Sequence, residues 1–81
     1  MNTQVEMRVG GNIINVLHIA RIEGSPDRHS VNKYVGGFRR PGEQPDWYAD
    51  DMIEFEHRYG DGIEELVRKA LNAIKESEEL Q

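Results

Sequence analysis

Alternation of apolar and polar residues predicts strands in the first part of the chain. Apolar side chains recur at every second position of residues 4–9, which indicates a strand with one apolar face. Gly10 and Gly11 follow, and two glycines that tolerate positive φ favour a tight hairpin turn. The next run, residues 13–23, is apolar at both parities. We therefore expect it to be a central strand that is covered in part on both faces.

Two further strands are expected on either side of one clear loop. Residues 30–40 are interrupted by the pair Gly36-Gly37, which predicts a bulge or a sharp bend. Residues 40–46 hold two prolines and a glycine, a composition typical of a loop. Residues 52–59 alternate cleanly between apolar and polar, so we expect a strand with one face in water.

The C-terminal segment has the periodicity of an amphipathic helix. Apolar residues recur at helical spacing from residue 63 to residue 74. Asp61 is a suitable N-cap, and Glu64 three residues later completes the spacing of a capping box. Residues 76–81 are rich in acid, which opposes the helix dipole, so fraying is expected from about residue 76.

Together these elements predict a single α+β domain over residues 1–81. The expected architecture is an antiparallel β-meander of three to four strands, followed by one C-terminal amphipathic helix packed on one sheet face. One helix covers one face only, so Leu17 and Ile19 or their neighbours are expected to be partly exposed on the other face. That face is either a polar surface with a few aliphatic residues, or a surface for a homodimer or partner, as an edge strand also is.

Composition narrows the class of protein. The 81 residues include no cysteine, which excludes disulfides and thiolate metal sites. No apolar run reaches the roughly 18–20 residues of a membrane helix, and the first residues lack a signal-peptide pattern, so a cytoplasmic protein is expected. The formal net charge is -5, but most bases lie at or before residue 40 and most acids after residue 42. This asymmetry favours a charged protein partner or self-association.

The residues that most often carry catalysis are not arranged for it. His18, His29 and His57 fall on three different expected elements, with no spacing typical of a metal site. No serine has the context of a nucleophile, and Glu54 and Glu56 are expected on a solvated strand face. We therefore predict a protein that is not an enzyme, with no catalytic residue, no metal and no cofactor.

The segment 38–51 is the most distinctive part of the chain. It combines arginines, prolines and two adjacent aromatic residues, and these residue types are enriched among the hot spots of interfaces. The residues predicted to bind a partner are Phe38, Arg39, Arg40, Trp47 and Tyr48. For Trp47 a second interpretation stays open, in which the indole folds back and caps one end of the core.

Nucleic-acid binding is the competing function. Arg28, Lys33, Arg39 and Arg40 lie among aromatic residues, a combination that can track phosphates and stack bases. The isoelectric point near 5.1 and the acids of the same loop argue against it. We therefore expect a protein-interaction module, with nucleic-acid binding as the alternative.

Two resemblances bear on the source of the chain. The segment from Tyr34 to Leu71, YVGGFRRPGEQPDWYADDMIEFEHRYGDGIEELVRKAL, resembles small uncharacterised proteins of actinobacterial phages of the mycobacteriophage kind. This resemblance implies an accessory protein, made in the cytoplasm of an infected bacterium, that binds a host or phage protein. The stretch from Gly60 to Glu65 is also similar to HicB-type antitoxins, in which a short sheet precedes a helix. The long loop 40–49 departs from that pattern.

Overall fold

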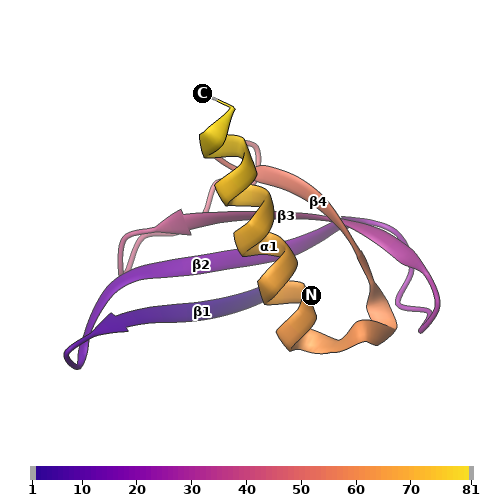
Figure 1. Cartoon of the computed structure of the whole chain (residues 1–81), viewed down its shortest axis with the longest axis horizontal. Coiled ribbons are helices and arrows are strands. Elements are labelled where there is room, and N and C mark those ends of the chain that lie inside the picture. The colour runs from indigo at the N-terminus through magenta and orange to yellow at the C-terminus, as the bar shows by residue number, and fades with distance from the viewer. Residues whose placement is uncertain (1, 81) are drawn as a thin grey trace.

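The fold is a four-stranded sheet with one long helix (Figure 1). The computed structural model describes residues 2–80. Its elements are β1 (Asn2–Val9), β2 (Asn12–Glu23), β3 (Val31–Arg39), β4 (Ile53–Arg58), the short 3₁₀ turn η1 (Tyr59–Asp61) and α1 (Gly62–Glu79). The strands pair antiparallel in the order β1-β2-β3-β4, and α1 packs against the sheet. The expected α+β meander with a C-terminal helix is confirmed.

The tight turn expected at the first hairpin is present. Gly10 and Gly11 have φ values of 57° and 87°, and they alone separate β1 from β2. Positive φ at both central positions matches the right-handed twist of the flanking strands. The side chain of Arg8 donates a hydrogen bond to the carbonyl of Gly11 over 3.2 Å, which closes the turn further.

The main core lies between the sheet and α1. Its buried residues come from β2, β3 and α1, and they are Leu17, Ile19, Tyr34, Leu66 and Ala70. Half-buried apolar side chains surround them: Val5, Phe38, Phe55, Val67, Leu71 and Ile74. Leu17 and Ile19 are 0% and 1% exposed, so the expectation that they are partly exposed is wrong. They face the helix, and the opposite parity of β2 faces the other side of the sheet.

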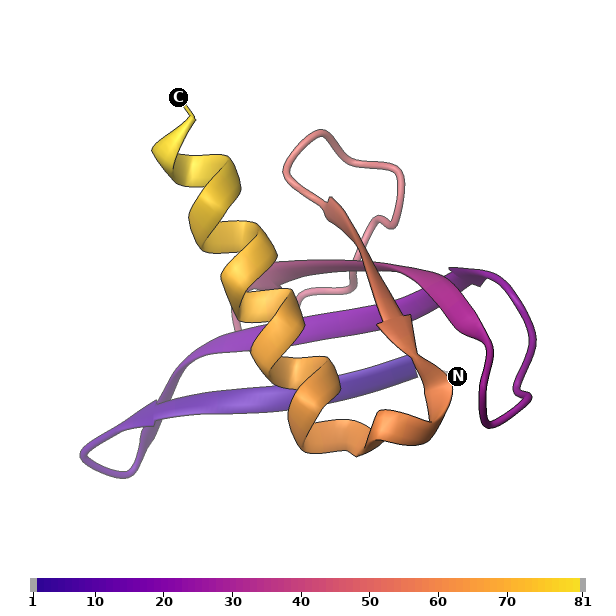
Figure 2. The ribbon, with the colours of Figure 1, turned by 45° about the vertical axis from the view of Figure 1, so that its right-hand side comes forward.

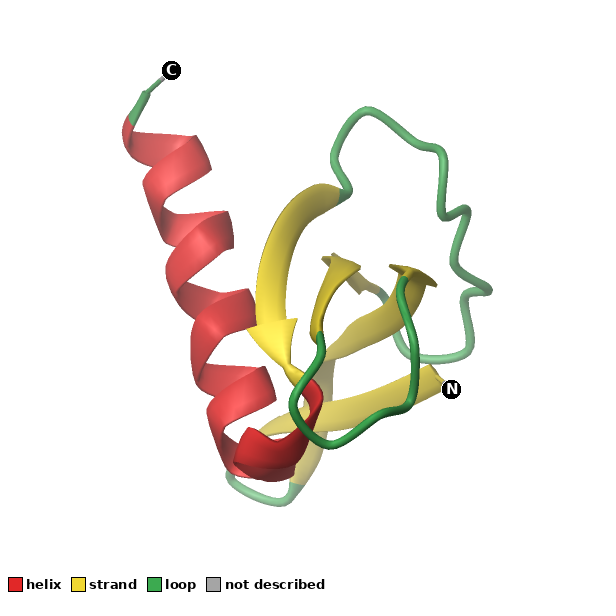
Figure 3. Ribbon diagram, turned by 90° about the vertical axis from the view of Figure 1, so that its right-hand side faces the viewer, coloured by secondary structure: helices red, strands yellow, loops and turns green. Residues whose placement is uncertain are grey.

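The other side of the sheet is covered by the loop between β3 and β4. Figure 3 shows this loop on the side of the sheet opposite α1. A second cluster of Ala20, Val35 and Met52 is buried there, with Trp47 and Ala49 of the loop packed against it. The face that the sequence leaves open is therefore closed over β2 and β3, because the loop serves as a second layer. The side chains of β1 and β4 on this face stay exposed, among them Glu6 and Glu54.

The glycine pair of β3 does not form the expected bulge. The pairing of β2 with β3 runs without a register shift through Ile19–Gly36 and His18–Gly37. Close packing explains Gly37 instead, whereas Gly36 has room for a Cβ at ordinary contact distance. A Cβ at Gly37 would lie 2.5 Å from Met52 Sδ, whereas a Cβ at Gly36 would meet the Phe55 ring at 3.4 Å.

The start of the helix differs from the expectation. Asp61 makes no side-chain cap, because η1 leads directly into α1 and holds Asp61 in helical φ and ψ rather than the extended conformation of an N-cap. At the other end the helical backbone continues to Glu79. The fraying expected for the acidic tail from about residue 76 stays a prediction.

Candidate functional site

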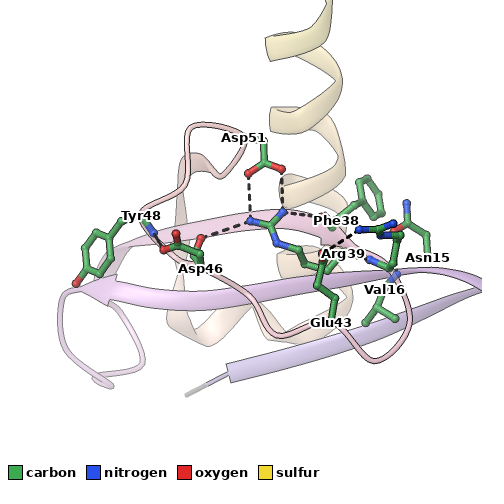
Figure 4. Close-up of polar contacts among 9 residues, drawn as sticks. Asn15, Val16, Phe38, Arg39, Glu43, Asp46, Tyr48 and Asp51 are labelled. Carbon is green, nitrogen blue, oxygen red and sulfur yellow. Dashed lines mark hydrogen bonds and ion pairs between the residues drawn. The ribbon is translucent and has the colours of Figure 1, made fainter.

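The segment 40–52, here called the cover loop, is held by one buried arginine. Arg39 ends β3, and its guanidinium donates two hydrogen bonds to the carboxylate of Asp51, at 2.9 and 3.1 Å (Figure 4). The same group donates to the carbonyls of Phe38 at 2.7 Å and Asp46 at 3.5 Å. Arg39 is 9% exposed. Two parallel hydrogen bonds from a guanidinium to a carboxylate fix the orientation of both groups as well as their distance. Arg39 therefore ties both halves of the cover loop to the sheet.

Trp47 fastens the middle of the cover loop. Its half-buried ring lies edge-on to the ring of His18, with the centroids 6.3 Å apart. It also packs against the buried cluster that contains Val35 and Met52. Of the two interpretations of Trp47, the contacts are those of a side chain that caps the core.

Next to this fastened residue, Tyr48 lies in solvent. Its side chain is 95% exposed, and Figure 4 shows it directed away from the Arg39 cluster. The backbone is nevertheless fixed, because the N–H of Tyr48 donates to the Asp46 carboxylate over 3.1 Å. At the other end of the loop, the Arg40 N–H donates to the Glu43 carboxylate over 3.2 Å, and the two side chains form an ion pair at 3.6 Å.

The five residues predicted to bind a partner thus have different surroundings. Arg40 and Tyr48 are exposed on the cover loop, Trp47 is half-buried beneath it, and Arg39 is almost fully buried. Phe38 points to the helix side, where it packs against the main core. The structure therefore brings four of the five together around the loop and separates Phe38 from them by the thickness of the sheet.

Asp51 is the residue of this site that the sequence did not single out. It stands twelve positions after Arg39, at a spacing that belongs to no local motif. The signal that points to it is indirect: a long loop with an arginine at its start and acids at its end can be closed by an ion pair. Asp50 and Asp51 satisfy that condition equally in the sequence, and only the fold selects between them.

The buried histidines lie on opposite faces of the sheet. His18 is on the loop side, and its pKa is lowered by burial and then by the nearby charge of Arg39. His57 is on the helix side, with its ring 5.7 Å from that of Tyr34. Burial, followed by Lys69, lowers the pKa of His57, while Asp61 and Glu65 act in the opposite direction. Burial therefore favours the neutral form of both rings.

His57 also has an unusual hydrogen-bonding state. It is 2% exposed, and its Nδ1 has no hydrogen-bond partner within residues 2–80. Within the same residues, no group of three or more histidine and acidic side chains is placed to hold a metal ion. The exposed groups of the cover loop are the ring of Tyr48 and the guanidinium of Arg40, next to backbone N–H groups that are held by Asp46 and Glu43.

Comparison with known proteins gave no match to a protein-family model, a curated protein or a solved structure. Among residues 2–80, no helix is long and apolar enough to cross a membrane.

Proposed function

We propose that the chain is a non-enzymatic protein-interaction module that presents Tyr48 and Arg40 of the cover loop to a protein partner. The observation that carries the proposal is an aromatic side chain 95% exposed on a loop whose backbone is fixed on both sides. Tyrosine and arginine dominate the binding energy of many interfaces. A loop that is already ordered loses little conformational entropy when it binds.

The distribution of charge supports a protein partner over a nucleic acid. Two of the four cations Arg28, Lys33, Arg39 and Arg40 are paired with acids away from the exposed part of the cover loop: Arg39 is buried against Asp51 at 2.9 Å, and Lys33 lies 3.9 Å from Glu23. Binding to phosphates by counterion release needs several free cations close together. Nucleic-acid or antitoxin-like regulation is the alternative, and a gel-shift titration at low salt tests it: a shift that Arg40→Ala removes would favour it.

The resemblance to actinobacterial phage proteins supports a biological setting for the proposal. A phage-encoded accessory factor would act in the cytoplasm of the bacterial host cell, on a host or phage protein. An acidic domain suits that role, since Tyr48 and Arg40 of the cover loop can contact a partner while the net charge keeps the protein dispersed.

The test is affinity capture from a bacterial lysate with four forms of the chain, the wild type, Ile63→Ala, Tyr48→Ala and Arg40→Ala, read by quantitative mass spectrometry. The wild type and Ile63→Ala, an exposed apolar residue of α1 remote from the loop, are expected to enrich the same protein. Tyr48→Ala is expected to lose it by about tenfold or more, the range of a hot-spot residue. Purified partner and titration calorimetry then confirm direct binding. An enriched set that Tyr48→Ala and Arg40→Ala leave unchanged would refute the role of the cover loop.

A further inference from the structure

The hairpin of β1 and β2 projects from the body of the molecule. Figures 1 and 2 show its turn extending well beyond α1 and the remaining strands. β1 is an edge of the sheet, paired with β2 alone among the described residues. The β1–β2 pairing has one irregularity, between Met7 and Arg8, where Ile14 of β2 is the extra residue. The outer side of β1 is therefore a regular row of backbone donors and acceptors open to another strand.

Apolar side chains are exposed on the same hairpin of β1 and β2. Val9 and Ile14 are 62% and 57% exposed, although both are β-branched residues beside a strand turn. Val5 and Met7, at alternate positions of β1, are only half-buried because the sheet ends beside them. A second strand beside β1 would continue the sheet and cover this apolar row.

The sequence of β1 is complementary to itself in one register. When two copies pair antiparallel about a two-fold axis through Met7, each Glu6 lies opposite Arg8 of the second copy, and Val5 lies opposite Val9 of the second copy. Glu6 and Arg8 already form an ion pair within one chain at 3.6 Å, and their side chains are 50% and 54% exposed. The pairing would place four charges in alternation on one face and an apolar row on the other.

The neighbouring registers fit less well. An axis through Glu6 sets that carboxylate opposite its own copy, which is a repulsive pair. An axis through Val5 sets both charges opposite amides, Glu6 against Gln4 and Arg8 against Asn2. It also places the second strand along the end of β1 where Gln4 lines a pocket with cover-loop residues 42–44.

We propose that the β1 edge of the sheet is a homodimer interface. In the dimer, β1 pairs with β1 of a second copy about a two-fold axis through Met7 to form one continuous eight-stranded sheet. Both copies contribute the same surface, as a closed two-fold contact requires. A strand-pairing interface of this length is small, so association depends on protein concentration. The interface is separate from the cover loop and does not rest on the partner proposed above.

Charge exchange across the two-fold axis tests the register. Sedimentation equilibrium of the purified chain is expected to show a mass that rises from one copy toward two with concentration. Arg8→Glu and Glu6→Arg each turn two attractive pairs into two repulsive pairs, and each is expected to weaken association by about tenfold or more. The double variant Glu6→Arg/Arg8→Glu restores the pairs and is expected to return to wild-type association.

A matched variant controls for net charge. Arg58→Glu makes the same charge change at an exposed position of β4 and is expected to leave association unchanged. Circular dichroism checks that each variant is folded, and the two single variants provide independent tests. The proposal is overturned if the wild type stays a single copy up to millimolar concentration, or if the double variant associates no better than the single ones. Tyr48→Ala changes neither result, so failure here is distinct from failure of the cover-loop proposal.

Discussion

The ion pair between Arg39 and Asp51 gives the sharpest test of how the cover loop is held. Asp51→Asn removes the charge that faces Arg39 while it keeps the size and one acceptor oxygen of the side chain. The guanidinium then stays 9% exposed, with the carbonyls of Phe38 and Asp46 as its other partners. A nearly buried cation without its counter-charge destabilises the folded state.

The magnitude follows from the exposure of the two partners. Loss of one partner of a fully buried pair costs about 3–5 kcal/mol. The Asp51 side chain is 68% exposed, so water screens much of the attraction, as in surface pairs that contribute about 0–1 kcal/mol. Between these limits we expect a loss of about 1–2 kcal/mol in the free energy of unfolding. For a domain of this size, that is a decrease of roughly 5–15 °C in the melting temperature.

Two signals separate loosening of the loop from global unfolding. Fluorescence of Trp47, the single tryptophan, reports the cover loop, and far-UV circular dichroism reports α1 and the sheet. The control is Asp50→Asn, which makes the same chemical change at the adjacent exposed acid, outside the Arg39 cluster. If Asp51→Asn and Asp50→Asn agree within about 0.5 kcal/mol in urea denaturation, the ion pair does not hold the loop and the reasoning is refuted.

Two further predictions concern the interior on either side of the sheet. Burial lowers the pKa of His57, so as the pH falls the unfolded chain binds the proton before the folded chain does. The free energy of unfolding is therefore constant above about pH 6.5 and decreases below it. In urea denaturation between pH 7.5 and 5, His57→Phe should flatten that decrease, whereas the control His29→Gln, at an exposed position, should not. Gly37→Ala is expected to cost about 1–3 kcal/mol through overpacking against Met52, more than Gly36→Ala, and equal losses in thermal denaturation would contradict the packing explanation.

The regular elements could be predicted because each depends on local pattern. The alternation of β1, the Gly10-Gly11 turn and the helical spacing of α1 all follow from neighbours in the sequence. Asp61 failed as an N-cap because η1, a feature with no clear sequence signal, determines its backbone angles.

The candidate site could be predicted only in part because it depends on which face each residue occupies. The sequence selects the cover loop by composition, and Tyr48 and Arg40 are exposed there. Phe38 and Arg39, adjacent in β3, point to opposite sides of the sheet as strand alternation requires, but the sequence does not show which side the cover loop closes. It also gives no reason to choose Asp51 over Asp50, since that choice depends on the path of twelve residues of loop.

The two proposed surfaces have a joint consequence for binding. A two-fold axis perpendicular to the sheet leaves both helices on one face and both cover loops on the other, because paired antiparallel residues share a face. A dimer would therefore present two copies of Tyr48 on the same side. A partner with two matching sites, or a repetitive one, would bind the dimer far more tightly than a single loop, through effective concentration rather than new contacts. In that case Arg8→Glu weakens capture of the partner at low protein concentration while the affinity of each single loop is unchanged. Binding of the wild type and of Arg8→Glu to immobilised partner is compared at high and at low surface density. If Arg8→Glu loses the same amount of binding at both densities, the loops act singly.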